Sequence, residues 1–176
     1  MDHTNQIIED IFKDRQLMIA EDFNAYKNHV YRVFSNCSSL DPDPAMSVKY
    51  AIAAAFHDIG IWTHHTFDYL VPSAAEAVDY LRSIQREEWK DEITSMIYWH
   101  HKVTPYRGKF EMTVDTFRKA DWMDVTLGLV AFGHDRKRIR RSFQIFPPYG
   151  FHWFLVKRAF FNFFRHPLNP LPMFRR

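Results

Sequence analysis

Two histidines and two aspartates, spread over three predicted helices, have side chains that can hold a metal ion. His57 and Asp58 are neighbours at the end of the apolar segment SVKYAIAAAF, and burying such an ionisable pair costs free energy unless a hydrogen-bond partner or a metal holds it. His29 lies on an earlier predicted helix, and Asp121 lies half-way along a later one. Two imidazoles and two carboxylates suit Mn, Mg, Fe, Co, Ni or Zn and leave positions for water or substrate. One divalent metal ion at these four residues would explain the buried pair.

The segments that must position these residues have helical patterns. Apolar residues recur at helical spacing in NQIIEDIFKDRQLM and in DFNAYKNHVYRVFSNC, which carries His29. Asp22 is a candidate N-cap for the second of these helices. Pro44 suits the first position of the next helix, which is expected to run to about residue 56. Gly60 is expected to mark the stop of that helix.

Three more helices are expected further along the chain. The segment IWTHHTFDYLVP is expected to be a loop, after which Ser73 and Glu76 have the spacing of a capping box that opens a helix. Two more helical segments follow, KDEITSMIYWHH and DTFRKADWMDVTLGLVAF. The sequence shows no β-alternation of useful length and no internal repeat. It therefore predicts an all-α fold, a single compact bundle of five to seven helices.

Composition narrows the classes of protein further. The chain has 176 residues, of which 47% are hydrophobic and 25% charged, as is ordinary for a globular domain. The single cysteine, Cys37, excludes an intramolecular disulfide and a cysteine zinc cluster. The start, MDHTNQIIEDIFKD, has no apolar segment of the kind found in secretory signals, and no apolar run approaches the roughly 18 residues that span a bilayer. We therefore expect a cytoplasmic protein.

The segments NHVYRV, AFHDIG and RKADWMDV, taken in this order, carry the four candidate ligands. They resemble the HD-domain superfamily of metal-dependent phosphohydrolases, whose pattern is H…HD…D on an all-helical core, and the resemblance spans roughly residues 21–129. It implies an HD-like domain over residues 1–133 in which His29, His57, Asp58 and Asp121 bind one divalent metal ion. It also implies hydrolysis of a small phosphate ester or nucleotide through a metal-activated water.

A second metal is the main alternative within the same family. Dinuclear members have further histidines between the HD pair and the last aspartate, and here Asp68 or Tyr69 stands where the first of these is expected. His100 or His101 could match the second. We therefore expect one metal, and we keep an HD-type hydratase or a dinuclear iron oxygenase as the alternative function.

Several polar residues are candidates for contacts with an anionic substrate. The expected substrate-binding residues are Arg32, Glu76, His100, His101, Lys102 and Arg107. Each has a simpler structural interpretation. Arg32 could orient a carboxylate or lie at the surface, and Glu76 could simply complete the capping box. A histidine at the C-terminal end of a helix is favoured by the helix dipole, which is a sufficient reason for His100 and His101. Catalytic roles are expected for Asp58, His100 and His101, whereas His64 and His65 are expected to be loop residues at the mouth of the site.

The C-terminal extension, residues 134–176, differs from the rest in charge and aromatic content. It holds ten Lys or Arg against one acid, Asp135, and the segment FHWFLVKRAFFNFFR is rich in phenylalanine. A terminal helix packed on the same domain is the first interpretation. Residues 143–176 could instead contact an anionic membrane surface or a protein, which would make the protein peripheral to the inner face of a membrane. Nucleic-acid binding is a further interpretation, but no recognition module is legible. A non-catalytic, metal-stabilised module that attaches through this extension is the alternative of another class.

Overall fold

The structure, a computed structural model, describes residues 3–168 and 172–174, and all regular structure in this part of the chain is helical. This confirms the all-α prediction. The helices of ten or more residues that precede residue 133 are α1 (His3–Lys13), α3 (Phe23–Leu40), α4 (Pro44–Phe56), α6 (Leu70–Ser83), α7 (Lys90–Trp99) and α8 (Glu111–Val125). The C-terminal extension adds α9 (Arg136–Ile145) and α10 (Phe151–Arg165). The shorter helices are α2 (Gln16–Ile19), α5 (Gly60–Thr63), η1 (Ala20–Asp22), η2 (Glu87–Trp89) and η3 (Pro172–Phe174).

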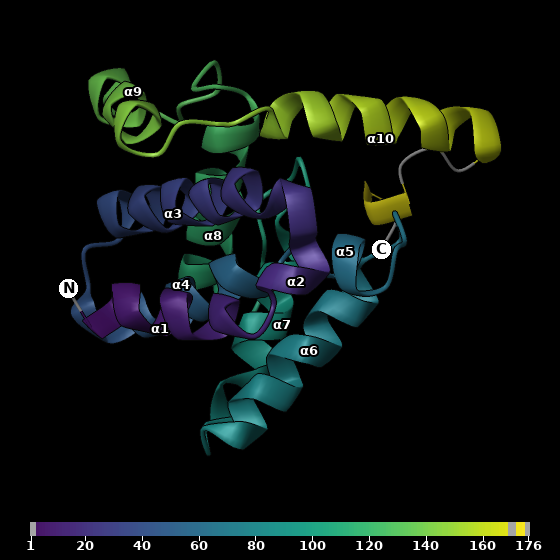
Figure 1. Ribbon diagram of the computed structural model, residues 1–176. Helices are drawn as coiled ribbons and strands as arrows, with labels where there is room; N and C mark the ends of the chain where they lie inside the picture. The colour runs from purple at the N-terminus through teal and green to yellow at the C-terminus, as the bar shows by residue number, and fades with distance from the viewer. Residues whose placement is uncertain (1–2, 169–171, 175–176) are drawn as a thin grey trace.

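Helix α4 is the centre of the bundle. Every residue from Tyr50 to Phe56 is buried, and the helix packs against α1, α3, α6 and α7 (Figure 1). Four alanines in this stretch keep the helix thin, so that neighbours on several sides can approach it closely. Pro44 occupies the first turn, and the side chain of Asp43 caps it by accepting a 2.9 Å hydrogen bond from the amide of Ala45. The C-terminal end of α4 therefore delivers His57 and Asp58 into the core.

Helices α3 and α8 lie along each other beside α4. The Asn36 side chain on α3 donates a 3.1 Å hydrogen bond to the carbonyl of Ala120 on α8, and both groups are buried. This bond fixes the register of the two helices next to Asp121. As a result, the His29 side of α3 faces the Asp121 side of α8.

The junction between α4 and α6 differs from the sequence-based prediction. Helix α6 begins at Leu70, so Ser73 lies inside the helix and the predicted capping box of Ser73 and Glu76 is wrong. The Ser73 hydroxyl instead accepts a 2.9 Å hydrogen bond from the amide of Gly60, which opens the short helix α5. The chain turns tightly here: a Cβ on Gly60 would lie 2.8 Å from the carbonyl oxygen of Tyr69. Close backbone approach, rather than a helix stop, is what requires glycine.

Asp22 precedes α3 as predicted, but its carboxylate makes no cap bond to that helix. It accepts a 2.9 Å hydrogen bond from the indole of Trp62 on α5 and so ties the start of α3 to that helix. Helices α9 and α10 lie together above α3, with which both make contact (Figure 1). Among the described residues, no helix is long and apolar enough to cross a membrane.

Candidate metal centre

The four predicted ligands meet in the core, between α3, the end of α4 and α8. The Nε2 atoms of His29 and His57 lie 2.9 Å apart. Oδ2 of Asp58 lies 3.3 Å from Nε2 of His57, and Oδ1 of Asp121 lies 3.5 Å from Nε2 of His29. Ligand atoms that are each about 2.1 Å from one ion lie about 3.0–3.4 Å from one another. His29, His57 and Asp58 each offer a ligand atom within 4.8 Å of the others, so these three donors could hold an ion, and Asp121 lies beside the two histidines.

Hydrogen bonds at the far side of each ring fix the tautomers of the two imidazoles. Nδ1 of His57 donates a 2.8 Å hydrogen bond to the carbonyl of Ala54, and Nδ1 of His29 donates one of 2.6 Å to Oδ2 of Asp124. In the neutral form of each ring, Nε2 then carries a lone pair. Two lone pairs that face each other at 2.9 Å repel unless a cation lies between them. Both rings are therefore oriented as metal ligands are in proteins.

The charges of the centre also call for a cation. Asp58 and Asp121 are buried, and Oδ1 of Asp58 and both carboxylate oxygens of Asp121 make no hydrogen bond within the described residues. Burial raises the pKa of each carboxyl, but the neighbouring histidines outweigh burial and hold both pKa values below the usual range. Burial likewise lowers the pKa of His57, yet the charges of Asp58 and Asp121 raise it to about 10. Positive charge is thus strongly favoured between these groups, whether a proton or a metal supplies it.

Asp124 and Arg32 form a buried support behind His29, and the sequence pattern did not reveal the first of them. Nε and Nη2 of Arg32 donate hydrogen bonds of 2.6 Å and 3.0 Å to the two oxygens of Asp124. Nη1 donates a third bond to the carbonyl of Phe146, at 2.8 Å. Arg32 is completely buried and therefore orients a carboxylate, as one of the two interpretations expected. Asp124 lies one helical turn after Asp121, and that spacing was the only available signal.

A second donor group adjoins the first and shares Asp58 with it. Asp58, His100 and His101 each offer one ligand atom within 4.8 Å of the others. Nε2 of His100 lies 3.4 Å from Oδ1 of Asp58, and its Nδ1 donates to the carbonyl of Ile97, so this ring also presents a lone pair. Tyr69, one of the two residues expected at the place of a further histidine, bonds Nε2 of His101 through its hydroxyl. The end of α7 thus lies against the centre.

Aromatic rings close most of the centre. Phe151, the first residue of α10, stacks on His29 with 4.1 Å between the ring centroids, and the edge of Phe117 meets His57 at 5.7 Å. Five of the six histidine and aspartate side chains of the two donor groups and Asp121 are at most 3% exposed, whereas that of His101 is 17% exposed. The centre is therefore least enclosed on the side of His101. The low-dielectric wall strengthens every electrostatic interaction inside.

Glu76, a predicted substrate contact, lies outside this cluster. Its carboxylate bonds the hydroxyl of Thr63 and lies 3.5 Å from the guanidinium of Arg15. Oε1 lies 3.7 Å from Nδ1 of His64, whose side chain is half exposed. Glu76 thus connects α6 to α5 and to the segment after α1.

The remaining predicted substrate contacts follow α7. Lys102 lies partly exposed directly after His101, close to the open side of the centre. Arg107 is largely exposed and pairs with Glu111 one turn on. His65 is an exposed loop residue with a left-handed backbone, as the loop prediction allowed. Of these residues, the chain places only Lys102 next to the cluster.

Comparisons of the chain with protein-family models, with curated proteins and with solved structures gave no match. The centre is nevertheless compatible with an HD-like metal site, because a buried His/Asp cluster on a helical core has donors within ligand distance. Any inference about function therefore rests on the residues and geometry of this centre.

Proposed function

We propose that the chain is an HD-type, metal-dependent phosphohydrolase that acts on a small phosphate ester or nucleotide. One observation carries the proposal: the Nε2 atoms of two anchored imidazoles meet at 2.9 Å beside two buried carboxylates. The order of these residues along the chain, H…HD…D, supports the same family. A purely structural cluster would satisfy its buried oxygens with protein donors, which this one does not.

His29, His57, Asp58 and Asp121 would hold a single divalent ion. When bound, such an ion supplies a Lewis acid that lowers the pKa of water and offsets negative charge on a phosphoryl oxygen. The protein's part is to hold both imidazoles as lone-pair donors and to keep bulk water away from the carboxylates. Hydrogen bonds from His57 to Ala54 and from His29 to Asp124 hold the two imidazoles. The aromatic rings around the centre, such as Phe151, keep bulk water out.

His101 is the residue best placed to meet substrate, because it lies at the open side. Burial and the neighbouring His100 lower the pKa of His101 to about 3, so the ring is neutral near pH 7. With the Tyr69 hydroxyl donating to Nε2, Nδ1 carries the ring proton on the side of Asp121, whose Oδ2 lies 4.0 Å away. That N–H can donate a hydrogen bond to an oxygen of a bound ester and so stabilise its negative charge. Lys102 follows directly and adds a cation at the same side.

The proposal is tested by metal content together with phosphatase activity. The purified wild-type protein is expected to carry about one equivalent of a divalent metal and to hydrolyse phosphate esters when supplied with that ion. Asp58→Ala should lose both properties, whereas His134→Ala, a histidine outside the cluster, should keep both. Absence of metal after loading with Mn, Fe, Co, Ni or Zn would contradict the site, and bound metal without hydrolysis of any phosphate ester would contradict the reaction.

The second donor group favours one rival activity, a dinuclear iron oxygenase. The two oxygens of Asp58 face different histidines: Oδ2 lies 3.3 Å from His57 and Oδ1 lies 3.4 Å from His100. Asp58, His100 and His101 would hold a second ion, and iron at both donor groups would supply the redox chemistry of an oxygenase. Two equivalents of iron and consumption of oxygen would replace the hydrolase proposal with this one.

A further inference from the structure

Helix α10 exposes an apolar stripe along its whole length. Trp153, Val156, Phe160, Phe163 and Phe164 recur at i, i+3, i+7, i+10 and i+11, which places them on one side of a helix. Trp153 is 62% exposed, Phe160 59% and Phe164 66%. The opposite side of the helix begins with Phe151, which is buried against His29. Core packing thus explains the start of α10 but leaves this stripe without a partner in the described chain.

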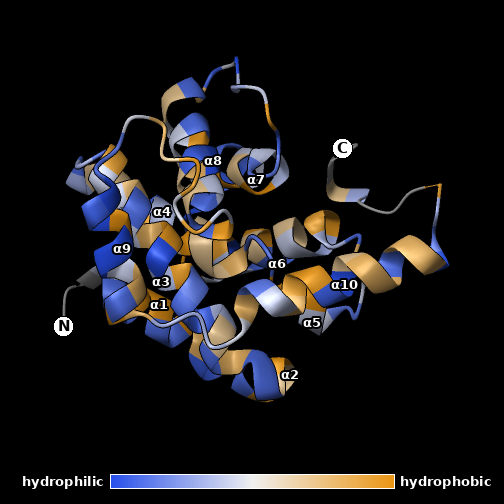
Figure 2. Cartoon of the chain, turned by 90° about the horizontal axis from the view of Figure 1, so that it is seen from above, coloured by the Kyte–Doolittle hydropathy of each residue, from blue (hydrophilic) through white to orange (hydrophobic). Residues whose placement is uncertain are grey.

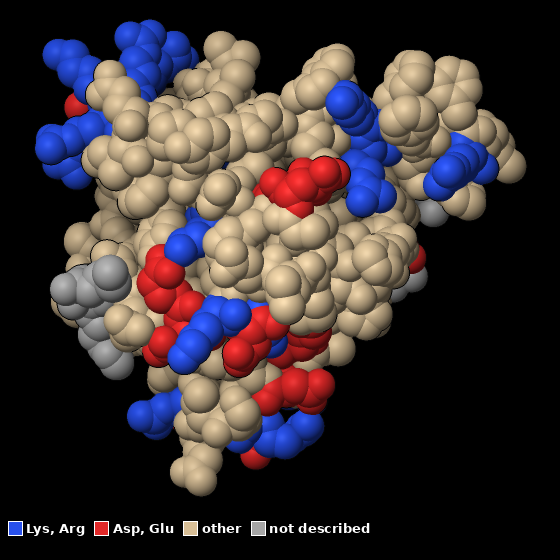
Figure 3. All heavy atoms as spheres, in the orientation of Figure 1, with Lys and Arg blue, Asp and Glu red and all other residues tan. Residues whose placement is uncertain are grey.

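A cluster of cations lies on the neighbouring helix of the same layer. Helix α9 carries five exposed cations, namely Arg136, Lys137, Arg138, Arg140 and Arg141. The one acid nearby, Asp135, caps the helix by accepting a hydrogen bond from the amide of Lys137. Figure 1 shows α9 and α10 together along one face of the molecule, and Figure 3 shows the Lys and Arg side chains gathered over α9. In the view onto this face, α9 is mostly hydrophilic and α10 mostly hydrophobic (Figure 2).

We propose that α9 and α10 form a docking face for an anionic membrane surface. Aromatic and aliphatic side chains of α10 would enter the boundary between headgroups and acyl chains, while the cations of α9 remain at the level of the lipid phosphates. Helix α10 projects beyond the body of the protein in Figure 1, so its stripe can reach a flat surface without obstruction. This attachment is independent of the reaction performed in the core.

The positive charge of α9 favours an anionic bilayer, rather than a second copy of the chain, as the partner of this face. Self-association through this face would bring two α9 cation clusters together, and like charges at close range oppose such a contact. The stripe favours a bilayer over nucleic acid for a different reason. Bases stack on separate aromatic rings, whereas this stripe is continuous along the helix and includes the aliphatic Val156, which suits the boundary of acyl chains. An anionic bilayer can contact both parts of the face, because its phosphates attract the cations of α9 and its acyl boundary accepts the apolar side chains of α10.

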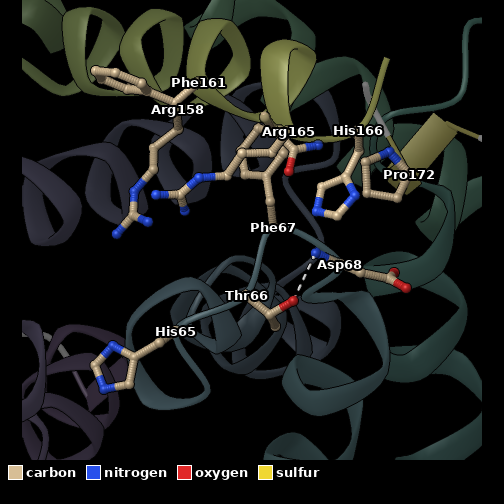
Figure 4. A pocket seen from close by; sticks show the side chains of 10 residues that line it. His65, Thr66, Phe67, Asp68, Arg158, Phe161, Arg165, His166 and Pro172 are labelled. Atoms are coloured by element: carbon tan, nitrogen blue, oxygen red, sulfur yellow. Dashed lines mark hydrogen bonds between the residues drawn. The ribbon is translucent and has the colours of Figure 1, made fainter. Parts of the chain in front are cut away.

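A pocket on the other side of α10 offers a second place for anions and must be separated from the docking face. Arg158 and Arg165 extend from α10 towards the loop that holds His65 and Thr66 (Figure 4). Their helical spacing places them on the opposite side of α10 from the stripe. These two arginines, with His166, line a cavity of about 340 Å³. Binding through this pocket would depend on Arg158 and Arg165, whereas binding through the proposed face depends on α9 and on the stripe.

The test is co-sedimentation of the full chain with phosphatidylcholine vesicles that contain about 30% phosphatidylserine, which gives them an anionic surface. Wild-type protein is expected to bind these vesicles and to bind pure phosphatidylcholine at least about tenfold more weakly. Phe160→Ser with Phe164→Ser, and separately Lys137→Glu with Arg140→Glu, should each weaken binding by about tenfold or more. All variants are first compared with wild type by circular dichroism and metal content.

Matched controls use equivalent changes elsewhere. Leu17→Ser with Met112→Ser removes two exposed apolar side chains outside the face, and Arg82→Glu with Arg86→Glu reverses two exposed arginines near the end of α6. Both should bind like wild type. The proposal is overturned if wild type ignores the anionic vesicles, if the controls lose as much binding as the face variants, or if only Arg158→Ala with Arg165→Ala abolishes it. A dimer in solution that Phe160→Ser with Phe164→Ser dissociates, without vesicle binding, would assign the face to a second copy instead.

Discussion

Nδ1 of His29 and Oδ2 of Asp124 are joined by a 2.6 Å hydrogen bond that is completely buried. The carboxylate is itself held by two bonds from Arg32. The ring of His29 is thereby held from behind while Nε2 faces the centre. Carboxylates that accept a hydrogen bond from the far nitrogen of a metal-binding histidine commonly take this arrangement.

Replacing Asp124 with asparagine should weaken metal binding by about 10–100-fold, because the amide no longer fixes the ring or raises its basicity. The same change leaves the buried charge of Arg32 without its partner and should lower the free energy of unfolding by about 3–5 kcal/mol. Urea denaturation measures the second effect, and competition with a chelator measures the first on protein that is still folded. A folded variant that binds the metal as tightly as wild type would show that Asp124 does not orient His29 as a ligand.

Removing the proposed metal should destabilise the whole domain, since two buried carboxylates then lose a compensating charge. An ion present at a hundred times its dissociation constant adds about 2.7 kcal/mol, which raises the melting temperature by roughly 5–10 °C for a chain of this size. Thermal melts with and without chelator measure the shift. Asp58→Ala should show no shift, and a shift of equal size in that variant would mean that the ion binds elsewhere.

Gly60→Ala should reduce the free energy of unfolding by about 1–3 kcal/mol, because the new methyl group would lie 2.8 Å from the backbone oxygen of Tyr69, which cannot move aside cheaply. Gly108→Ala is the matched control: its methyl group meets only the mobile side chain of Tyr106, so it should cost less than about 1 kcal/mol. Urea midpoints compare the two. Equal costs would contradict the close approach between α5 and α6.

Asp115 gives a pH dependence that is separate from the metal centre. Burial raises the pKa of its carboxyl, but hydrogen bonds from Arg118 and Lys119 outweigh burial and lower it. A lowered pKa in the folded state stabilises the fold at pH values above the unfolded pKa of about 3.9, and this stabilisation is lost as the pH falls through the folded value. Asp115→Asn should therefore cost about 1–3 kcal/mol at pH 7. The difference from wild type should stay constant down to about pH 5 and close below about pH 4, as urea titrations at several pH values can establish.

The sequence predicted the helices and the four central donors for physical reasons. Apolar spacing reports which face of a helix is buried, and an ionisable pair at the end of an apolar helix signals a buried polar site. His57 and Asp58 stood out on that ground. The two histidines at the end of α7 were candidates because, with Lys102, Thr104 and Arg107, they form a compact group of donors suited to an anionic substrate.

Other features depended on tertiary contacts that no local pattern encodes. Ser73 with Glu76 has the spacing of a capping box, yet Ser73 bonds Gly60 because α5 and α6 pack tightly. Asp124 looks like an ordinary helical aspartate until α3 brings Arg32 and His29 against it. Such pairings join residues far apart along the chain, so their partners become visible only in the fold.

The stacking of Phe151 on His29 has a consequence for the order in which the centre is completed during synthesis. The histidines and aspartates of the cluster have all been translated by residue 124, but the ring that covers His29 is added later, with α10. A nascent chain that folds from its N-terminus therefore gathers the donors before it can shut them off from solvent. Uptake of the proposed ion is least obstructed in that interval, because Phe151 of α10 covers His29 only after the donors are in place.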